Sequence, residues 1–259
     1  MLHDNLTLLT TAPALSSGSA LGKALRYPLR LLPRSLAMPI VTGSLRGRRW
    51  IVGSSLHRCW MGVYEDEKQQ LIARTVQTNT VFYDVGANVG FYTLLGSRLV
   101  GAGKVFAFEP LLHNLEYLRK HLALNRIQNV EVLELAVADE NADALFEVEA
   151  TGSMGHLSHG GTVKVQTATL DSLLEQGRIL PPNYIKMDIE GAELAALRGA
   201  QRCIQQYRPQ IFLATHGQEI HSQCCRLLES WGFECQIVEF TANGFGELVA
   251  SCKLAPRRC

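Results

Sequence analysis

Acidic side chains and glycines follow the apolar runs of this chain at the spacing of a ligand-binding loop. Residues 81–93, VFYDVGANVGFYT, combine a β-branched and aromatic strand with a turn at Gly86 and Gly90 and the start of a helix. Asp84 precedes the turn, where its carboxylate would repel a pyrophosphate and attract a cation. Phe91 stands where a dinucleotide fingerprint needs a third glycine. The turn therefore favours S-adenosylmethionine, which has an ammonium, a sulfonium and no phosphate.

The next strand supplies a second acid for the same ligand. The run KVFAFEP contains Glu109, about twenty residues beyond the turn, where such folds place an acid on ribose hydroxyls. We expect Asn88 and Gly90 to present backbone N–H groups to the methionine carboxylate at a helix N-terminus. Ala136 and Val137, taken as the end of the third strand, are expected to flank the adenine. The predicted cofactor-binding residues are Asp84, Gly86, Asn88, Gly90, Glu109, Ala136 and Val137.

Asp188 and His216 are the candidate catalytic residues. Each follows an apolar strand core, so both should emerge at the carboxyl edge of a parallel sheet. There they would handle the proton of an acceptor hydroxyl, either directly, with His216 as the base, or through a divalent cation such as Mg²⁺. The metal ligands are left open. Glu190 and Glu193 can equally serve only to complement a helix dipole, and His216 can be a structural histidine.

Beyond these residues the chain resembles the FkbM-type methyltransferases, a family of class I S-adenosylmethionine-dependent enzymes. The resemblance implies O-methylation of a sugar or other small-molecule hydroxyl. Thr215 departs from the pattern, since an acid is expected there. The resemblance covers roughly residues 60–217 and rests on WMGVYEDE (60–67), DVGANVGFYTLLGS (84–97), VFAFEP (105–110), NVEVLELAVAD (129–139), TLDSLL (169–174) and IKMDIEGAELAALRGA (185–200).

Alternating strand and helix patterns from about residue 66 predict an α/β fold. We expect a doubly wound, mostly parallel, Rossmann-like methyltransferase sheet with an antiparallel C-terminal strand. A hairpin insertion is expected around the glycine-rich segment 151–161. Residues 65–259 are the predicted methyltransferase domain, and residues 1–64 a basic N-terminal extension with short amphipathic helices within 21–36 and a small hairpin near 40–53.

Charge is distributed unevenly along the 259 residues. The first 64 residues contain eight basic side chains and one acid, a charge of +7, whereas the remainder has 17 basic and 23 acidic side chains, a charge of −6. Nucleic acid is therefore not an expected partner of the domain, but peripheral membrane contact through the basic segment is. The seven cysteines are an odd number without a C-x-x-C pair, and apolar runs are too short for a membrane span. These features are typical of a cytoplasmic protein, and the oligomeric state is left open.

The sequence thus predicts methyl transfer from S-adenosylmethionine to a hydroxyl oxygen of a small-molecule or glycan acceptor. Two alternatives stay open. A nicotinamide-dependent oxidoreductase uses a similar sheet but is disfavoured by Asp84 and Phe91. A non-catalytic module that keeps the cofactor pocket would be expected to have lost pocket residues that are present here.

Overall fold

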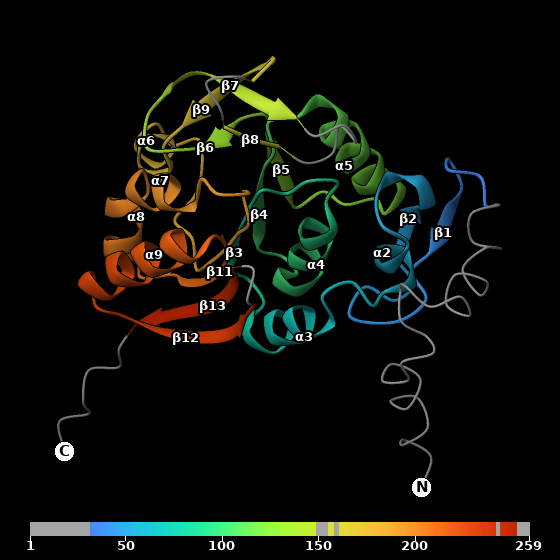
Figure 1. Ribbon diagram of the computed structural model, residues 1–259. Helices are drawn as coiled ribbons and strands as arrows, with labels where there is room; N and C mark the ends of the chain where they lie inside the picture. The colour runs from blue at the N-terminus through green and yellow to red at the C-terminus, as the bar shows by residue number, and fades with distance from the viewer. Residues whose placement is uncertain (1–31, 149–154, 158–160, 242–243, 253–259) are drawn as a thin grey trace, which may run out of the picture.

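A seven-stranded sheet forms the centre of the protein in the computed structural model (Figure 1), which describes residues 32–148, 155–157, 161–241 and 244–252. Its strand order is β12-β13-β11-β10-β3-β4-β5. The pairs from β11 to β5 are parallel, and β13 runs antiparallel to both of its neighbours. The mostly parallel sheet and its antiparallel C-terminal strand confirm the predicted fold class. The strands are β3 (Val81–Val85), β4 (Lys104–Phe108), β5 (Val130–Leu133), β10 (Tyr184–Met187), β11 (Gln210–His216), β12 (Phe233–Phe240) and β13 (Phe245–Cys252).

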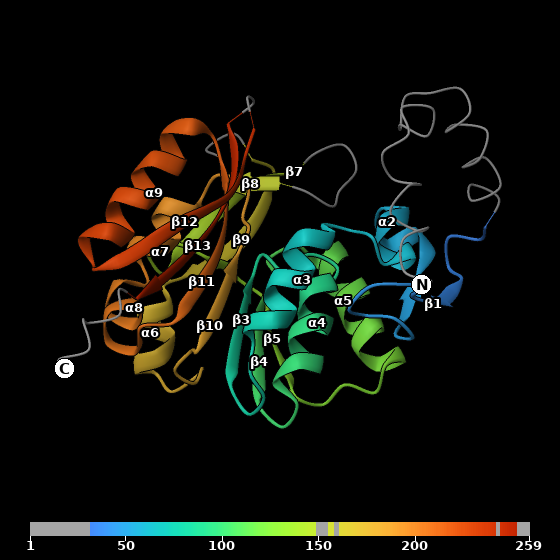
Figure 2. The same ribbon diagram turned by 90° about the horizontal axis from the view of Figure 1, so that it is seen from below.

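Helices cover both faces of this sheet, as expected when parallel strands are joined by crossovers. Figure 2 shows α3, α4 and α5 on one face and α6, α7, α8 and α9 on the other. Their bounds are α3 (Asp66–Thr75), α4 (Phe91–Val100), α5 (Leu112–Leu124), α6 (Leu170–Glu175), α7 (Glu193–Arg198), α8 (Gln201–Tyr207) and α9 (Gln218–Ser230).

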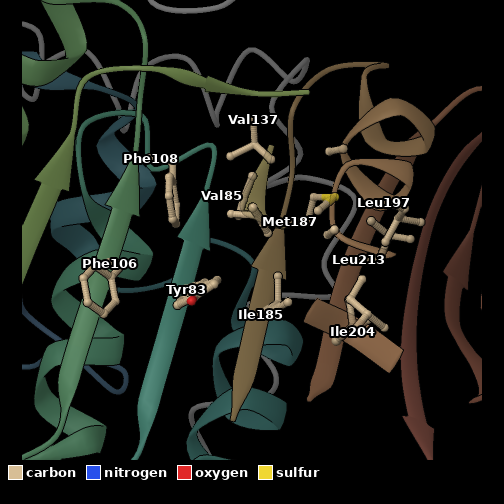
Figure 3. Packing of buried hydrophobic residues seen from close by; sticks show 14 of the residues in the cluster. Tyr83, Val85, Phe106, Phe108, Val137, Ile185, Met187, Leu197, Ile204 and Leu213 are labelled. Carbon is tan, nitrogen blue, oxygen red and sulfur yellow. The ribbon is translucent and has the colours of Figure 1, made fainter. Parts of the chain in front are cut away.

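Side chains that alternate along the strands build two cores, one on each face. Tyr83, Phe106 and Ile185 belong to the cluster that packs against the later helices (Figure 3). Phe82 and Val105, one residue away on β3 and β4, belong to the cluster on the α4 face. This period of two, with both faces apolar, is the pattern of strands buried between helices.

Residues of the predicted N-terminal extension contribute to the second core. The expected hairpin forms from β1 (Ala37–Pro39) and β2 (Arg49–Ile51), followed by a short 3₁₀ turn (Val52–Ser54) and α2 (His57–Met61). Trp50 is fully buried, stacks on His121 with ring centroids 3.9 Å apart and meets Phe91 edge to face. The boundary at residue 64 stays a prediction, and the expected helices within 21–36 lie almost wholly outside the described residues.

A second, four-stranded sheet with the order β6-β9-β7-β8 is the predicted hairpin insertion. Ala136 and Val137 form β6 of this sheet and pair with β9, so placing them at the end of the third strand of the central sheet was wrong. That strand, β5, ends at Leu133, and a bend at Leu135 separates the two. The strands are β6 (Ala136–Val137), β7 (Ala142–Val148), β8 (Gly155–Leu157) and β9 (Val163–Ala168).

The segment between β10 and β11 forms two short helices, α7 and α8, rather than one continuous helix. The chain breaks at Gly199, where a Cβ atom would lie 2.0 Å from the Ala138 carbonyl oxygen. A glycine therefore allows the break to approach the segment after β6. None of the helices formed by the described residues combines the length and apolar character needed to cross a bilayer.

Candidate active site

A cavity of about 470 Å³ opens at the carboxyl ends of β3, β4 and β10, the edge at which open α/β sheets bind ligands. Six predicted site residues line it, and three do not. Asp84, Gly90 and His216 are not among the residues that form its surface. The predicted residues that line the cavity are Gly86, Asn88, Glu109, Ala136, Val137 and Asp188.

The turn at Gly86 brings two strand ends into direct backbone contact. Gly86 has φ 80°, and a Cβ atom there would lie 1.9 Å from the carbonyl oxygen of Asp188. The glycine is therefore needed for both its backbone conformation and the close approach of the loop after β10. This contact sets the spacing between the cofactor turn and the candidate catalytic acid.

Backbone N–H groups of this turn are already engaged inside the protein. The N–H of Asn88 donates to Glu109 Oε2 at 2.8 Å, and the N–H of Gly90 donates to the Ala87 carbonyl at 2.8 Å. Val89 donates to Asn88 Oδ1 at 2.7 Å. The turn satisfies these N–H groups within the protein, and the role expected of Asn88 and Gly90 toward an anion stays a prediction. Gly86 and Ala87 likewise donate to the Phe108 carbonyl, at 3.1 and 3.0 Å.

Glu109 is buried at the wall of the cavity and held by three donors. Its Oε2 accepts the Asn88 N–H, and its Oε1 accepts the Leu111 N–H at 3.0 Å and Asn114 Nδ2 at 3.1 Å. Burial raises the pKa of Glu109 above its ordinary value, although these hydrogen bonds oppose the rise. The carboxylate is fixed in orientation before any ligand arrives.

Asp84 is fully buried and paired with a lysine that the sequence analysis missed. Lys186 Nζ lies 3.2 Å from Asp84 Oδ1 and donates to the Gly86 carbonyl at 2.9 Å. Thr93 Oγ1 donates to Asp84 Oδ2 at 2.6 Å. Asp84 and Lys186 are direct partners in the register of β3 and β10. A lysine within the apolar strand YIKM was the available signal, because a buried lysine needs an acidic partner.

Asp188 and His216 come together with two further acids, Glu190 and Glu193. His216 Nε2 lies 3.7 Å from Asp188 Oδ1 and 3.4 Å from Glu190 Oε2. On its other side, Nδ1 lies 2.9 Å from Oε1 of Glu193, which is fully buried in the first turn of α7. Asp188 and Glu190 line the cavity, and His216 contacts both without being among the lining residues.

Nearby charges shift the pKa values of Asp188 and His216 in this cluster. Burial would raise the pKa of Asp188, but the ammonium groups of Lys68 and Lys186 and the ring of His216 outweigh it and hold this pKa below its ordinary value. Burial would lower the pKa of His216, but the hydrogen bond to Glu193 and the three nearby carboxylates raise it.

Lys68 of α3 forms ion pairs that link Asp188 to the start of α3 and to β13. Its ammonium group is buried and lies 3.1 Å from Glu65, 3.6 Å from Asp188 and 2.8 Å from Glu247 on β13. Glu65 also accepts a hydrogen bond from Tyr92 at 2.7 Å. Sequence reasoning did not identify Lys68, because its helix looks polar and its partner Glu247 lies 179 positions away.

Parts of this sequence are similar to known methyltransferases. The model of the FkbM methyltransferase domain matches residues 84–235. The hexuronic acid methyltransferase AglP of Haloferax volcanii is 28% identical over 144 residues, which are 54% of this chain and 58% of that protein. A protein called methyltransferase 1 from Beauveria bassiana is 24% identical over 140 residues, 45% of this chain and 56% of its own length. The chain thus spans less than two thirds of these relatives.

Among solved structures, the FkbM methyltransferase of Methylobacillus flagellatus superimposes with a TM-score of 0.48 at 20% identity, covering 66% of this chain and 43% of that one. The assignment to a family rests on the domain match, which spans more than half of the chain, begins near the end of β3 and includes β4, β10 and β11. The protein belongs to the FkbM methyltransferase family.

Proposed function

We propose that the protein transfers a methyl group from S-adenosylmethionine to a hydroxyl oxygen of a small-molecule or sugar acceptor. The observation that supports this best is the cavity between the Gly86 turn, Glu109 and Asp188, in a member of a methyltransferase family. Its two carboxylates stand at the ends of different strands, as a ligand with a ribose at one point and a cationic centre at another requires.

Residues of the cavity fit S-adenosylmethionine in shape and in charge. Its volume lies within the range of small-molecule sites, and apolar side chains such as Phe108, Leu135 and Val137 form part of its wall. Glu109 is positioned to accept hydrogen bonds from ribose hydroxyls, and Ala136 and Val137 to pack against the adenine. Asp84 would act indirectly, by holding Lys186 and through it the Gly86 carbonyl.

The same turn argues against a nicotinamide dinucleotide. A pyrophosphate is normally held by free backbone N–H groups at such a turn. Here the N–H groups of residues 86–90 are all donated to acceptors within the protein. These contacts favour a cationic cofactor over the oxidoreductase alternative.

S-adenosylmethionine, when bound, supplies an activated methyl group, so the protein itself has to align the acceptor and manage its proton. We propose that Asp188, on the cavity wall, orients the acceptor hydroxyl. His216 is not among the residues that line the cavity, and we propose that it acts through Asp188 and Glu190, whose carboxylates lie 3.7 and 3.4 Å from its Nε2. The similarity to a hexuronic acid methyltransferase supports a sugar-type acceptor.

Binding calorimetry with S-adenosylmethionine and with NAD tests the cofactor assignment on the whole chain. We expect saturable binding of S-adenosylmethionine and none of NAD at the same concentration. Tight NAD binding without binding of S-adenosylmethionine would contradict the proposal.

A further inference from the structure

We propose that Asp188, Glu190 and His216 form a binding site for one divalent cation at the edge of the cavity. Each offers one ligand atom, and these three atoms lie within 4.8 Å of one another. Two carboxylate oxygens and one imidazole nitrogen are a ligand set suited to Mg²⁺, Mn²⁺ or Fe²⁺. This inference rests on the proposed function, since the cation would polarise the acceptor hydroxyl, whose proton then passes to water.

The ligand atoms of the cluster lie slightly farther apart than ligands around one cation. His216 Nε2 lies 3.7 Å from Asp188 Oδ1 and 3.4 Å from Glu190 Oε2, longer than ordinary hydrogen bonds. Ligands about 2.1 Å from an octahedral cation lie about 3 Å from their neighbours. Small side-chain movements would therefore bring these atoms into coordination, without any change of the strands.

The orientation of His216 is a second, independent observation. Fully buried Glu193 directs Oε1 at His216 Nδ1, and its Oε2 has no hydrogen-bond partner among the described residues. A carboxylate that accepts one ring N–H turns the lone pair of the other nitrogen outward, as in metal-bound histidines. That nitrogen faces two carboxylates, which offer only acceptors when ionised. A cation between them completes the arrangement.

Backbone geometry also fixes the position of the Glu190 side chain. Its φ of 54° is in the left-handed region, which is unfavourable for a side chain of this size, and Gly191 follows with φ 104°. This turn brings the Glu190 carboxylate to the edge of the cavity and to His216. The side chain keeps 41% of its surface exposed, so packing alone does not explain its position.

Local charge favours a cation as well. Three carboxylates, those of Asp188, Glu190 and Glu193, surround His216. Lys68 contacts Asp188 but also lies within ion-pair distance of Glu65 and Glu247, so its single charge is shared among three acids. These carboxylates would attract a divalent ion in addition to the ammonium groups of Lys68 and Lys186, which already hold the pKa of Asp188 low.

Mn²⁺ binding, followed by electron paramagnetic resonance on the metal-free full chain, tests the site directly. We expect one Mn²⁺ per chain. Glu190→Gln should weaken this binding at least about tenfold, and Glu193→Gln, which removes the carboxylate that orients His216 and also accepts the Gly191 N–H, about 10–100-fold. The matched control Glu234→Gln alters an exposed acid on β12 and should leave binding unchanged. Equal Mn²⁺ affinity in all four proteins, or no binding by the parent, would overturn the proposal.

Two further measurements separate this inference from the proposed function. Thermal unfolding should show that Glu190→Gln, a change at a partly exposed side chain, stays folded. Calorimetry in the presence of EDTA should show that S-adenosylmethionine binding does not need the cation. Full methyl transfer in EDTA would overturn the cation site and leave the proposed function standing, whereas absence of S-adenosylmethionine binding would contradict the proposed function irrespective of Mn²⁺.

Discussion

At the scale of single residues, Glu109 is the side chain whose role can be tested most cleanly. Three donors already orient its carboxylate in the folded protein, so ligand binding does not have to lose the conformational entropy of this side chain. We expect Glu109→Ala to weaken S-adenosylmethionine binding by about 1.5–3 kcal/mol, the value of hydrogen bonds to a charged group. Calorimetry would measure this loss. Glu116→Ala on the exposed surface of α5 is the control, and equal affinities in the two variants would rule out the role.

Residue types indicated which positions matter, but not how their charges are paired. The sequence placed Asp84, Asp188 and His216 near one edge because all three follow strand cores, and the structure places them there. It could not show that Asp84 is neutralised by Lys186, or that Glu193 fixes His216, because both contacts depend on the packing of separate segments. The cofactor and catalytic roles themselves stay predictions.

At the scale of elements, the approach of the Gly86 turn to the loop after β10 sets the geometry of the site. Gly86→Ala would place a Cβ 1.9 Å from the Asp188 carbonyl oxygen. Gly177→Ala is a matched control, since Gly177 also has positive φ but no atom within 4 Å of an added Cβ. Both should lose about 1–3 kcal/mol of unfolding free energy to backbone strain. Gly86→Ala should lose more unfolding free energy than Gly177→Ala, and it alone should also weaken cofactor binding. Equal losses of the two variants in urea unfolding would contradict this account.

His121 connects three elements and makes stability depend on pH. Its ring accepts the Ile51 N–H of β2 through Nε2 at 3.1 Å and, with its proton on Nδ1, donates to the Val89 carbonyl at 2.7 Å. Burial lowers the pKa of His121 to about 4, below the ordinary histidine value. Protonation of His121 would also put an N–H donor at Nε2, opposite the Ile51 N–H, which would then lose its acceptor.

The sign of this dependence follows from the lowered pKa. Between about pH 6.5 and pH 4 the unfolded chain binds a proton that the folded His121 excludes, so stability is complete above this window and falls as the pH falls through it. We expect a contribution of about 2 kcal/mol to be lost between pH 6.5 and pH 5. Urea unfolding at several pH values would show it. His121→Gln should flatten the slope and His113→Gln, an exposed histidine of the same helix, should keep it; an unchanged slope in His121→Gln would disprove the assignment.

Most elements were predictable because their patterns are local. The alternating strand and helix patterns from about residue 66 and the glycine turn predicted the central sheet, and the sequence around the glycine-rich segment 151–161 predicted the insertion. The sequence did not predict that β5 ends at Leu133 or that Gly199 divides α7 from α8, because both features depend on contacts with the second sheet and the segment after it.

At the scale of the whole molecule, the uneven distribution of charge leads to a prediction about binding partners. The basic residues of the first 64 positions suggest contact with an anionic membrane surface, and residues 1–31 lie outside the described structure. We expect sedimentation with anionic vesicles that falls with salt and is lost on deletion of residues 1–36. Neutral vesicles are the control. Binding that survives the deletion, or none by the full chain, would refute this contact.

A methyl-transfer assay with isotopically labelled S-adenosylmethionine tests the central claim most directly. The full chain would be supplied with Mg²⁺ and a panel of hydroxyl acceptors that includes hexuronic acids, and the products analysed by mass spectrometry. We predict a labelled methyl group on an acceptor oxygen, and a rate at least about 10²-fold lower in Asp188→Asn. Binding of the cofactor without transfer to any acceptor would support a non-catalytic module, and transfer that is unaffected by Asp188→Asn would show that the acceptor site lies elsewhere.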